Sequence, residues 1–444
     1  MSVSAHPASP SSVATTPPRG GARRTLVGYG FALAVITYLD RICISAAAPS
    51  IMQDLNLSLV QMSVVFSAFT LAYSLFEVPS GWLADVVGPR RVLTRIVTWW
   101  SAFTMLTGGA WSYMSLVTLR FLFGAGEAGA FPSMVRSFSR WVPARERGQA
   151  NGVLFLGSRL GGALAPVLAF LLIQQVGWRA SFVIFGSIGF VWAASWYRWY
   201  RDDPARHPGV SAEELAWITQ DVGDAASGRL EGGGVPWRRL FTSRTVLAIC
   251  AMYFAFGYGL YFYFTWLPTY LTRVLGFSTL AGGLLAGLPF ALAGTADVVG
   301  GFLTDRLAAA RGLRVARCWL GAAAFIGCAA LLLLATAVDD RVAKAVLLAG
   351  ALGTADLALS AYWAVCLDVG KDYAGVVTGL MNTFGNLGGV IGPLVMGYAV
   401  ERWQSWTVPF YIAAAVYVAG AVAWLAVDPE ARIAAPHEGP DRTG

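Results

Sequence analysis

Twelve long apolar runs, separated by short polar segments, dominate this chain of 444 residues. A helix needs about 20 apolar residues to cross the hydrocarbon core of a membrane, and each run is long enough to do so. Because backbone polar groups inside a bilayer must be bonded within the protein, such runs predict helices. They lie at about 25–48, 60–84, 92–111, 113–135, 150–174, 178–199, 244–270, 280–304, 315–338, 343–367, 374–400 and 406–427. We therefore expect an all-α membrane protein with twelve transmembrane helices.

The composition agrees with a membrane protein and argues against a water-soluble enzyme. Hydrophobic residues make up 56% of the chain and charged residues 13%, whereas soluble proteins carry about a quarter charged residues. The net charge of +7 comes from arginines scattered between the apolar runs, unlike the continuous basic stripe of a nucleic-acid-binding protein. The cysteines lack Cys-x-x-Cys spacing and the histidines lie outside the runs, so we expect no metal site. Proton chemistry inside the membrane therefore depends on carboxylates.

The runs form two sets of six around a polar segment. We expect a disordered tail over 1–24, an N-terminal six-helix bundle over 25–200, a linker over 201–243, a C-terminal six-helix bundle over 244–428 and a tail over 429–444. In the linker, Ser211 and Glu214 have the spacing of a capping box, which predicts a short helix near 212–220. No secretory signal pattern precedes the first run.

The positions of the basic residues predict the orientation. If the N-terminus is cytoplasmic, 24 of the 32 Lys and Arg residues fall in cytoplasmic segments and five fall in loops on the other side. Basic residues accumulate on the cytoplasmic side of membrane proteins. Both termini are therefore expected in the cytoplasm.

Internal repeats relate the two halves. The segment Gly81-Trp-Leu-Ala-Asp85 recurs 220 residues later as Gly301-Phe-Leu-Thr-Asp305. The glycines and the proline of 148–166 recur with an offset of 227 in the eleventh run. A parallel duplication of six helices is typical of transporters whose substrate site lies between the halves, near the middle of the membrane.

Eight ionisable residues lie well inside the runs: Asp40, Arg41, Glu77, Arg120, Glu127, Arg159, Asp297 and Asp356. A charge at bilayer depth needs a partner or a water-filled cavity, so these residues mark a functional site. At about 1.5 Å per residue, Asp40, Arg41 and Arg120 lie at matching depth. Glu127 lies two turns, roughly 10 Å, further along the face of Arg120.

The sequence resembles the major facilitator superfamily. Residues 81–91, Gly-Trp-Leu-Ala-Asp-Val-Val-Gly-Pro-Arg-Arg, are similar to its motif between the second and third helices, and 301–306 is a degenerate copy. More narrowly, Tyr38-Leu-Asp-Arg41, the segment 120–127, Gly177-Trp-Arg179 and the segment 381–388 resemble the anion:cation symporter family, which includes galactonate, glucarate, hexuronate and sialin-type carriers. The resemblance covers about 25–427. It implies proton-coupled uptake of organic anions that uses an acid in the first helix, an acid in the fourth helix and the neighbouring arginines.

The buried charges divide into two expected roles. Asp40 and Glu127 are the candidate proton carriers. Arg41 and Arg120 are the candidate anion ligands, because a guanidinium stays charged and grips a carboxylate through two parallel hydrogen bonds. An arginine that leaves its carboxylate to bind a substrate anion couples binding to protonation. The alternative is a permanent network of salt bridges that serves only packing.

Other residues are assigned by their positions. Further substrate contacts are expected from Tyr38, Tyr73, Ser158, Arg159, Trp363, Asn382 and Asn386. A gate that stabilises one transport conformation is expected at the cytoplasmic helix ends, from Glu77, Asp85, Arg90, Arg91 and Asp305. Asp297 and Asp356 have two interpretations with Arg159: they face a substrate with a second carboxylate or a cationic group, or they form a latch between the halves.

We therefore predict a proton-coupled symporter of a small organic anion such as a sugar acid, in a bacterial inner membrane. It is expected to work as a monomer by alternating access, with the proton as coupling ion, no cofactor and no nucleic-acid partner. The alternative is a proton-coupled exporter of amphiphilic compounds. Superfamily antiporters favour a Gly-x-x-x-Gly-Pro type of run in the fifth helix, whereas the closer match here, 388–393, lies in the eleventh run. This position favours the symporter.

Overall fold

The computed structural model describes residues 21–219 and 237–431, where every regular element is a helix. In these two ranges, nine helical segments are long and apolar enough to cross a membrane. The first helices are α1 (Ala22–Asp54), α2 (Leu59–Val87), α3 (Pro89–Thr107), α4 (Tyr113–Glu127), α5 (Ala130–Trp141) and α6 (Ala144–Trp199). After the linker come α10 (Arg244–Thr265), α11 (Leu267–Thr269), η2 (Tyr270–Val274), α12 (Thr279–Arg311), η3 (Val315–Trp319), α13 (Leu320–Ala337), α14 (Arg341–Asp356), α15 (Leu359–Gly370), η4 (Lys371–Tyr373), α16 (Ala374–Trp403) and α17 (Thr407–Ala426).

Two glycines mark two of the places where the helices do not follow the apolar runs one to one. Gly177 has φ 76° and ψ 165° inside α6, so two helices meet end to end there, and α6 covers both the fifth and the sixth run. Gly129 has φ 87° and separates α4 from α5 within the fourth run. A Cβ at Gly129 would lie 2.4 Å from the Cβ of Ser80 on α2. The break after Glu127 therefore lets the fourth run pack closely against α2.

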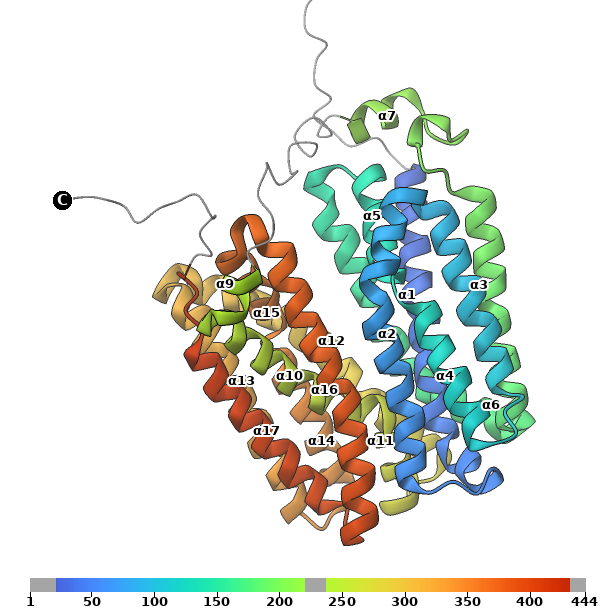
Figure 1. Cartoon of the computed structure of the whole chain (residues 1–444), viewed down its shortest axis with the longest axis vertical. Coiled ribbons are helices and arrows are strands. Elements are labelled where there is room, and N and C mark those ends of the chain that lie inside the picture. Colours follow the sequence, from blue (N-terminus) through green and yellow to red (C-terminus); the bar gives the residue numbers. More distant parts are fainter. Residues whose placement is uncertain (1–20, 220–236, 432–444) are drawn as a thin grey trace, which may run out of the picture.

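The first part of the linker is docked onto the N-terminal helices, whereas α9 (Trp237–Thr242) lies on the C-terminal bundle (Figure 1). That first part contains η1 (Pro204–Arg206) and α7 (Ala212–Thr219), and α7 lies across the end of the N-terminal bundle (Figure 1). Ser211 Oγ accepts the N–H of Glu214 at 3.1 Å, as a capping box requires. The Glu214 carboxylate does not close that box, however, because it accepts the backbone N–H groups of Ala22 and Arg23 at 3.1 and 3.0 Å. The linker helix thus caps the start of α1.

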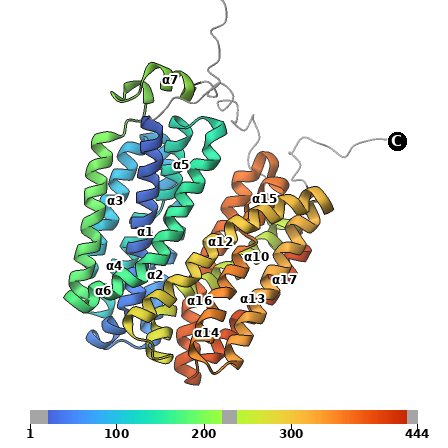
Figure 2. The ribbon, with the colours of Figure 1, turned by 180° about the vertical axis from the view of Figure 1, so that it is seen from behind.

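The helices form two bundles that meet at one end and diverge at the end that carries α7 (Figures 1 and 2). The contacts between the bundles run mainly along α2 with α16 and along α6 with α12. The polar contacts near the closed end are hydrogen bonds from Val60 N to Glu401 Oε2 (3.1 Å), from Ser67 Oγ to Val390 O (2.7 Å) and from Arg273 Nη2 to Pro49 O (2.6 Å).

Small residues allow the close approach of α6 and α12. A Cβ at Gly287 would lie only 2.1 Å from the carbonyl oxygen of Ala163, so a larger residue there would separate the helices. Along α2, polar contacts with the other bundle begin at Val60 and end at Glu77; the described part of 78–87 contributes none. The space between the bundles is therefore closed at one end and open towards α7.

Candidate functional site

A cavity of about 410 Å³ lies between the two bundles. Its volume is within the range of small-molecule sites. The N-terminal bundle contributes Tyr38, Arg41, Tyr73, Glu77, Phe131, Pro132, Val135 and Phe155. The C-terminal bundle contributes Tyr253, Phe256, Gly257, Leu260, Tyr261, Phe264, Trp363, Asn382, Gly385 and Asn386. Half of the lining residues are thus aromatic, and the charged or amide groups of the wall are one cation, one carboxylate and two amides.

Arg41 is the cation of the cavity wall, and it forms an ion pair with Glu127, which lies outside the wall. The Arg41 Nε donates to Glu127 Oε1 at 3.0 Å, and its Nη2 contacts the same oxygen. Glu127 is 1% exposed and does not line the cavity, whereas Arg41 does. The Arg41 Cζ also lies 5.0–5.3 Å from the ring centres of Tyr38, Phe69 and Tyr73. This arrangement presents a positive charge to the cavity while its partner carboxylate stays inside the protein.

Asp40 and Arg120 are buried away from the cavity. Asp40 Oδ2 accepts the indole N–H of Trp100 at 3.1 Å, and its Oδ1 has no hydrogen-bond partner among the described residues. The Nε and Nη1 of Arg120 are buried and equally unpartnered within the described ranges, and its Cζ lies 4.2 Å from the ring centre of Phe123. The prediction that Arg120 binds the anion is therefore not reflected in this conformation, in which Arg120 lines no part of the cavity.

Arg159 joins the two bundles through two carboxylates. From α6, its Nε and Nη2 donate to the two oxygens of Asp297 on α12 at 2.8 and 3.2 Å. Its Nη2 also donates to Asp356 Oδ1, at the end of α14, at 3.1 Å. None of the three residues lines the cavity. Of the two interpretations offered by the sequence, this conformation has the geometry of the latch.

Glu77 lies in the cavity and not with the loop between α2 and α3. Its Oε2 accepts hydrogen bonds from the amides of Asn382 at 2.8 Å and Asn386 at 3.4 Å, both on α16. In this conformation the Glu77 side chain points across to the other bundle, away from the loop with which the sequence grouped it, and its role in a gate stays a prediction. The two asparagines line the cavity, as the prediction of a substrate contact requires.

Among the other predicted gate residues, Arg90, Arg91 and Asp305 make no bridge between the bundles within the described ranges. Arg90 donates from Nε to the Tyr197 carbonyl at 3.0 Å, and its backbone N–H bonds to Asp202 Oδ1, so both contacts stay in the N-terminal half. Arg91 and Asp305 are exposed, and Asp305 has no hydrogen bond or ion pair within the described ranges. The side chain of Asp85 lies outside the described residues.

Ser158 does not reach the cavity, and two tyrosines that sequence reasoning missed do. Ser158 is buried, and its Oγ donates to the Leu154 carbonyl of its own helix. Tyr253 and Tyr261 on α10 line the cavity wall opposite Arg41. Their spacing of eight residues, with Gly257 between them, puts them on one face of a helix. That periodicity inside the aromatic run 253–264 was the available signal.

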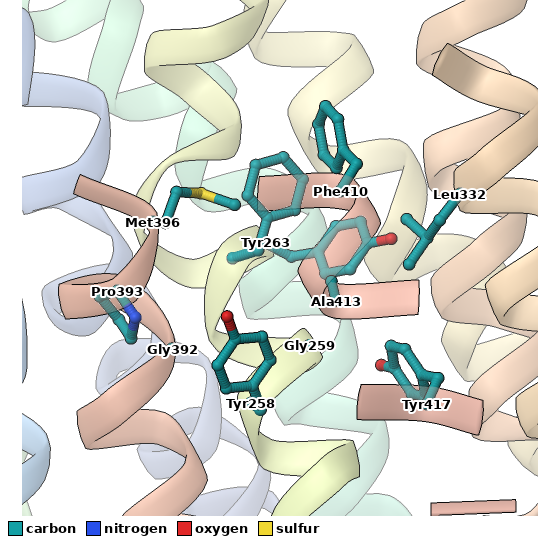
Figure 3. Close-up of a pocket in the computed structure, with 11 residues that line it drawn as sticks. Tyr258, Gly259, Tyr263, Leu332, Gly392, Pro393, Met396, Phe410, Ala413 and Tyr417 are labelled. Atoms are coloured by element: carbon teal, nitrogen blue, oxygen red, sulfur yellow. The ribbon is translucent and has the colours of Figure 1, made fainter. Parts of the chain in front are cut away.

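A second, closed pocket inside the C-terminal bundle has a different character (Figure 3). Its volume is about 10 Å³, and it is lined by aromatic and apolar groups such as Tyr258, Tyr263, Met396, Phe410 and Tyr417. Such a volume holds about one water molecule. This pocket is too small for a substrate.

Comparison with known proteins identifies the family. The model of the Major Facilitator Superfamily matches residues 30–393 and 369–443. A probable sulfoacetate transporter, SauU of Cupriavidus necator, is 36% identical over 420 residues, which are 94% of this chain and 96% of that protein. The hexuronate transporter of Bacillus subtilis is 30% identical, over 88% of this chain and 92% of the relative. The probable galactarate/D-glucarate transporter GarP of Escherichia coli K12 is 31% identical, over 84% and 87%.

Solved structures agree on the fold. A bacterial homologue of the human lysosomal transporter Spinster, in an inward-facing and unoccupied conformation, superposes with a TM-score of 0.71 over 91% of this chain and 94% of that chain, at 17% identity. These matches confirm the resemblance seen in the sequence and the expectation that the protein is not an enzyme. The chain belongs to the Major Facilitator Superfamily of multi-pass membrane transporters, and its relatives match the anion:cation symporter family.

Proposed function

We propose that this protein takes up a small organic anion together with protons across a bacterial inner membrane. It works as a monomer by alternating access, with the proton as the coupling ion and no other cofactor. Both termini are cytoplasmic, so the open end next to α7 faces the cytoplasm. Twelve membrane passes are supported by the two helices joined at Gly177 in α6, by the 19-residue α3 and by α4 and α5 sharing one run.

The observation that carries this proposal is the ion pair between Arg41 and Glu127. An anion that enters the cavity meets the Arg41 guanidinium and competes with Glu127 for it. Because Glu127 is 1% exposed, losing this partner would leave a buried carboxylate without a cation. Taking up a proton removes that unfavourable charge. Binding of the anion to Arg41 thus favours protonation of Glu127, and protonation of Glu127 favours binding of the anion.

The charge balance of the interior supports proton coupling. The eight ionisable residues inside the apolar runs are three arginines and five carboxylates, so the full set carries an excess of negative charge when ionised. A substrate anion adds to that excess. In a medium of low dielectric constant, the repulsion between uncompensated like charges is strong. Protons on the carboxylates would offset the added charge.

The substrate class is supported by the relatives and by the cavity wall. The relatives named above transport or are assigned sulfoacetate, hexuronate and galactarate or D-glucarate, all of them small organic acids. The cavity offers a guanidinium for an acid group, with amides and tyrosine hydroxyls that suit further oxygens. An exporter of amphiphilic compounds has less use for this set of polar groups.

Uptake into proteoliposomes under an imposed pH gradient tests the proposal. A panel of sugar acids and small carboxylates and sulfonates identifies substrates, and a dissipated gradient shows whether accumulation needs protons. Glu127→Gln should abolish proton-driven accumulation and leave exchange of internal for external substrate partly intact. Glu213→Gln, on the exposed face of α7, is the matched control and should behave as the wild type. Undiminished uphill accumulation by Glu127→Gln would overturn the proton-carrier role.

A further inference from the structure

Glu77 is the one carboxylate of the cavity wall, and the exchange between Arg41 and Glu127 makes no use of it. Its Oε2 receives two amide hydrogen bonds, from Asn382 at 2.8 Å and from Asn386 at 3.4 Å. The two asparagines are four residues apart, so they lie one above the other on one face of α16. Their side-chain amides can therefore both donate to one acceptor atom.

These hydrogen bonds connect the two halves of the transporter across the cavity. Glu77 belongs to α2 in the N-terminal bundle and the asparagines to α16 in the C-terminal bundle. Arg41 lies on the N-terminal side of the same cavity, where Glu127 engages it. The cavity thus has two anchors for acceptor oxygens, a guanidinium in one bundle and a pair of amides in the other. A carboxylate of the protein occupies each anchor.

No cation pairs with Glu77 within the described ranges, so its charge is balanced only by amide dipoles and by more distant groups. The titratable groups that face the same space are the following: Tyr73 on its own helix, Tyr38 and Arg41 on α1, Glu127 behind Arg41 on α4, and Tyr253 and Tyr261 on α10. The lining residues of α5, α6, α15 and α16 carry no charge. A substrate anion that binds beside Glu77 therefore finds one cation in the cavity wall, Arg41, and Arg41 is already paired with Glu127.

We propose that Glu77 is a built-in stand-in for part of the substrate: in the empty cavity it occupies the amides of Asn382 and Asn386, and the entering anion displaces it as Glu77 takes up a proton. The proton is exchanged with the solution on the side to which the cavity is open, so it is taken up with the anion from outside and released with it inside. Like-charge repulsion from the substrate favours the neutral carboxyl, and a neutral Glu77 is the weaker acceptor for the amides. The substrate then bridges the bundles in place of Glu77.

This proposal rests on the proposed function and defines the substrate class more narrowly. A substrate that bridges Arg41 and the two amides needs two separate acceptor groups. The first is an acid group for the guanidinium, and the second is a hydroxyl, carboxylate or sulfonate oxygen for the amides. A simple monocarboxylate with an apolar tail satisfies only the first anchor. Acids with two acceptor groups should therefore be preferred.

The test is the pH dependence of the KM for D-glucarate, which has several acceptor groups, measured in proteoliposomes. In Glu77→Gln, one fewer proton is linked to binding, so the slope of log KM against pH should fall by about one unit and the KM at pH 8 should fall below that of the wild type. Glu77→Asp keeps the charge and should keep the wild-type slope. Glu213→Gln again serves as control. A role limited to packing would change the amount of folded protein and leave this slope unaltered.

A second variant keeps the test decisive if Glu77→Gln does not fold. Asn382→Ala removes the better of the two donors, so it should raise the KM for D-glucarate and leave inhibition by propionate, which has a single acid group, unchanged. Equal effects on both compounds would overturn the inference, as would a wild-type slope in a folded Glu77→Gln. If the wild type accumulates none of the acids in the panel, the proposed function itself fails. If the wild type transports the acid and the Glu77 variants keep its slope and its KM, only the role of Glu77 is rejected.

Discussion

Arg159→Gln removes the cation shared by the two carboxylates that link the bundles. Asp356 is fully buried, and its only ion-pair partner in the described part of the chain would be lost. Removing one member of a buried pair costs about 3–5 kcal/mol, because the other charge stays buried and uncompensated. Asp297 is 20% exposed, so water compensates part of its loss and its share is about 1 kcal/mol or less.

Protonation limits the cost at Asp356. An aspartate that titrates near pH 3.9 in water needs about 4 kcal/mol to bind a proton at pH 7 and only about 1.5 kcal/mol at pH 5. The expected destabilisation by Arg159→Gln is therefore about 3–4 kcal/mol at pH 7, and it should shrink on acidification. For folding units of this size, about 2 °C in Tm corresponds to each kcal/mol, which predicts a fall of about 6–8 °C at pH 7.

The five cysteines provide the assay. Cys43, Cys250, Cys318, Cys328 and Cys366 are all free and buried, so a thiol-reactive fluorogenic dye reacts with them as the protein unfolds in detergent. In the double variant with Asp356→Asn, the fully buried carboxylate that lost its cation is neutral, so most of the lost Tm should return.

The control for this prediction is Arg206→Gln. Arg206 pairs with Asp203 three residues before it, and both side chains are largely exposed, so Tm should not change. The reasoning is refuted if Arg159→Gln melts within about 1 °C of the wild type, or if Asp356→Asn fails to restore it.

Three further outcomes are expected. Arg41→Lys should weaken substrate affinity about tenfold or more, because Lys loses the two parallel hydrogen bonds of the guanidinium; an unchanged KM in proteoliposomes would count against Arg41 as ligand. Glu214→Gln weakens the cap on α1 by about 1 kcal/mol and should speed hydrogen exchange in α7, whereas unchanged exchange there would contradict the docking. Burial between the rings of Trp141 and Trp199, and then the charge of Arg201, lower the pKa of His207 below its usual 6.5. The folded state thus favours neutral His207, and the resulting stability is present above about pH 6.5 and is lost as the pH falls below it. Exchange in 200–210 should therefore rise on acidification, and His207→Gln should remove that pH dependence.

The helices and the family could be predicted because they depend on local or one-dimensional patterns. Apolar runs of membrane-spanning length determine the helices, and the repeat of 81–85 at 301–305 indicates duplication without any knowledge of contacts. The breaks were harder to predict, since the positive φ of Gly129 accompanies a close approach to another helix that the local sequence does not show. The close approach of Ser80, which is 49 residues from Gly129, is not encoded near either position.

The site was predicted less completely, because depth along a helix does not say which way a side chain points. Counting residues placed Glu127 roughly 10 Å from the level of Arg41, yet the two are bonded, since the long Arg41 side chain covers much of that distance. The same counting brought Arg120 together with Arg41, although Arg120 turns into the bundle against Phe123. Glu77 and Asn382 are 305 residues apart, and only the contact between α2 and α16 brings them together.

The polar contacts between the bundles explain how occupancy and conformation can influence each other in this transporter. Near the closed end, the bonds from Arg273 to the Pro49 carbonyl and from the Val60 N–H to Glu401 involve no residue of the cavity wall. Nearer the open end, Glu77 and its two amide donors belong to the cavity itself, so an anion that takes those donors replaces a link within the protein by a link through the substrate. A ligand shifts a conformational equilibrium only by the difference in its affinity for the two states. On the proposed mechanism, Glu77 joins the bundles at this depth when the cavity is empty, and the anion joins them when the cavity is loaded. The two links differ in strength, and this difference in free energy determines whether a bound anion favours or opposes closure.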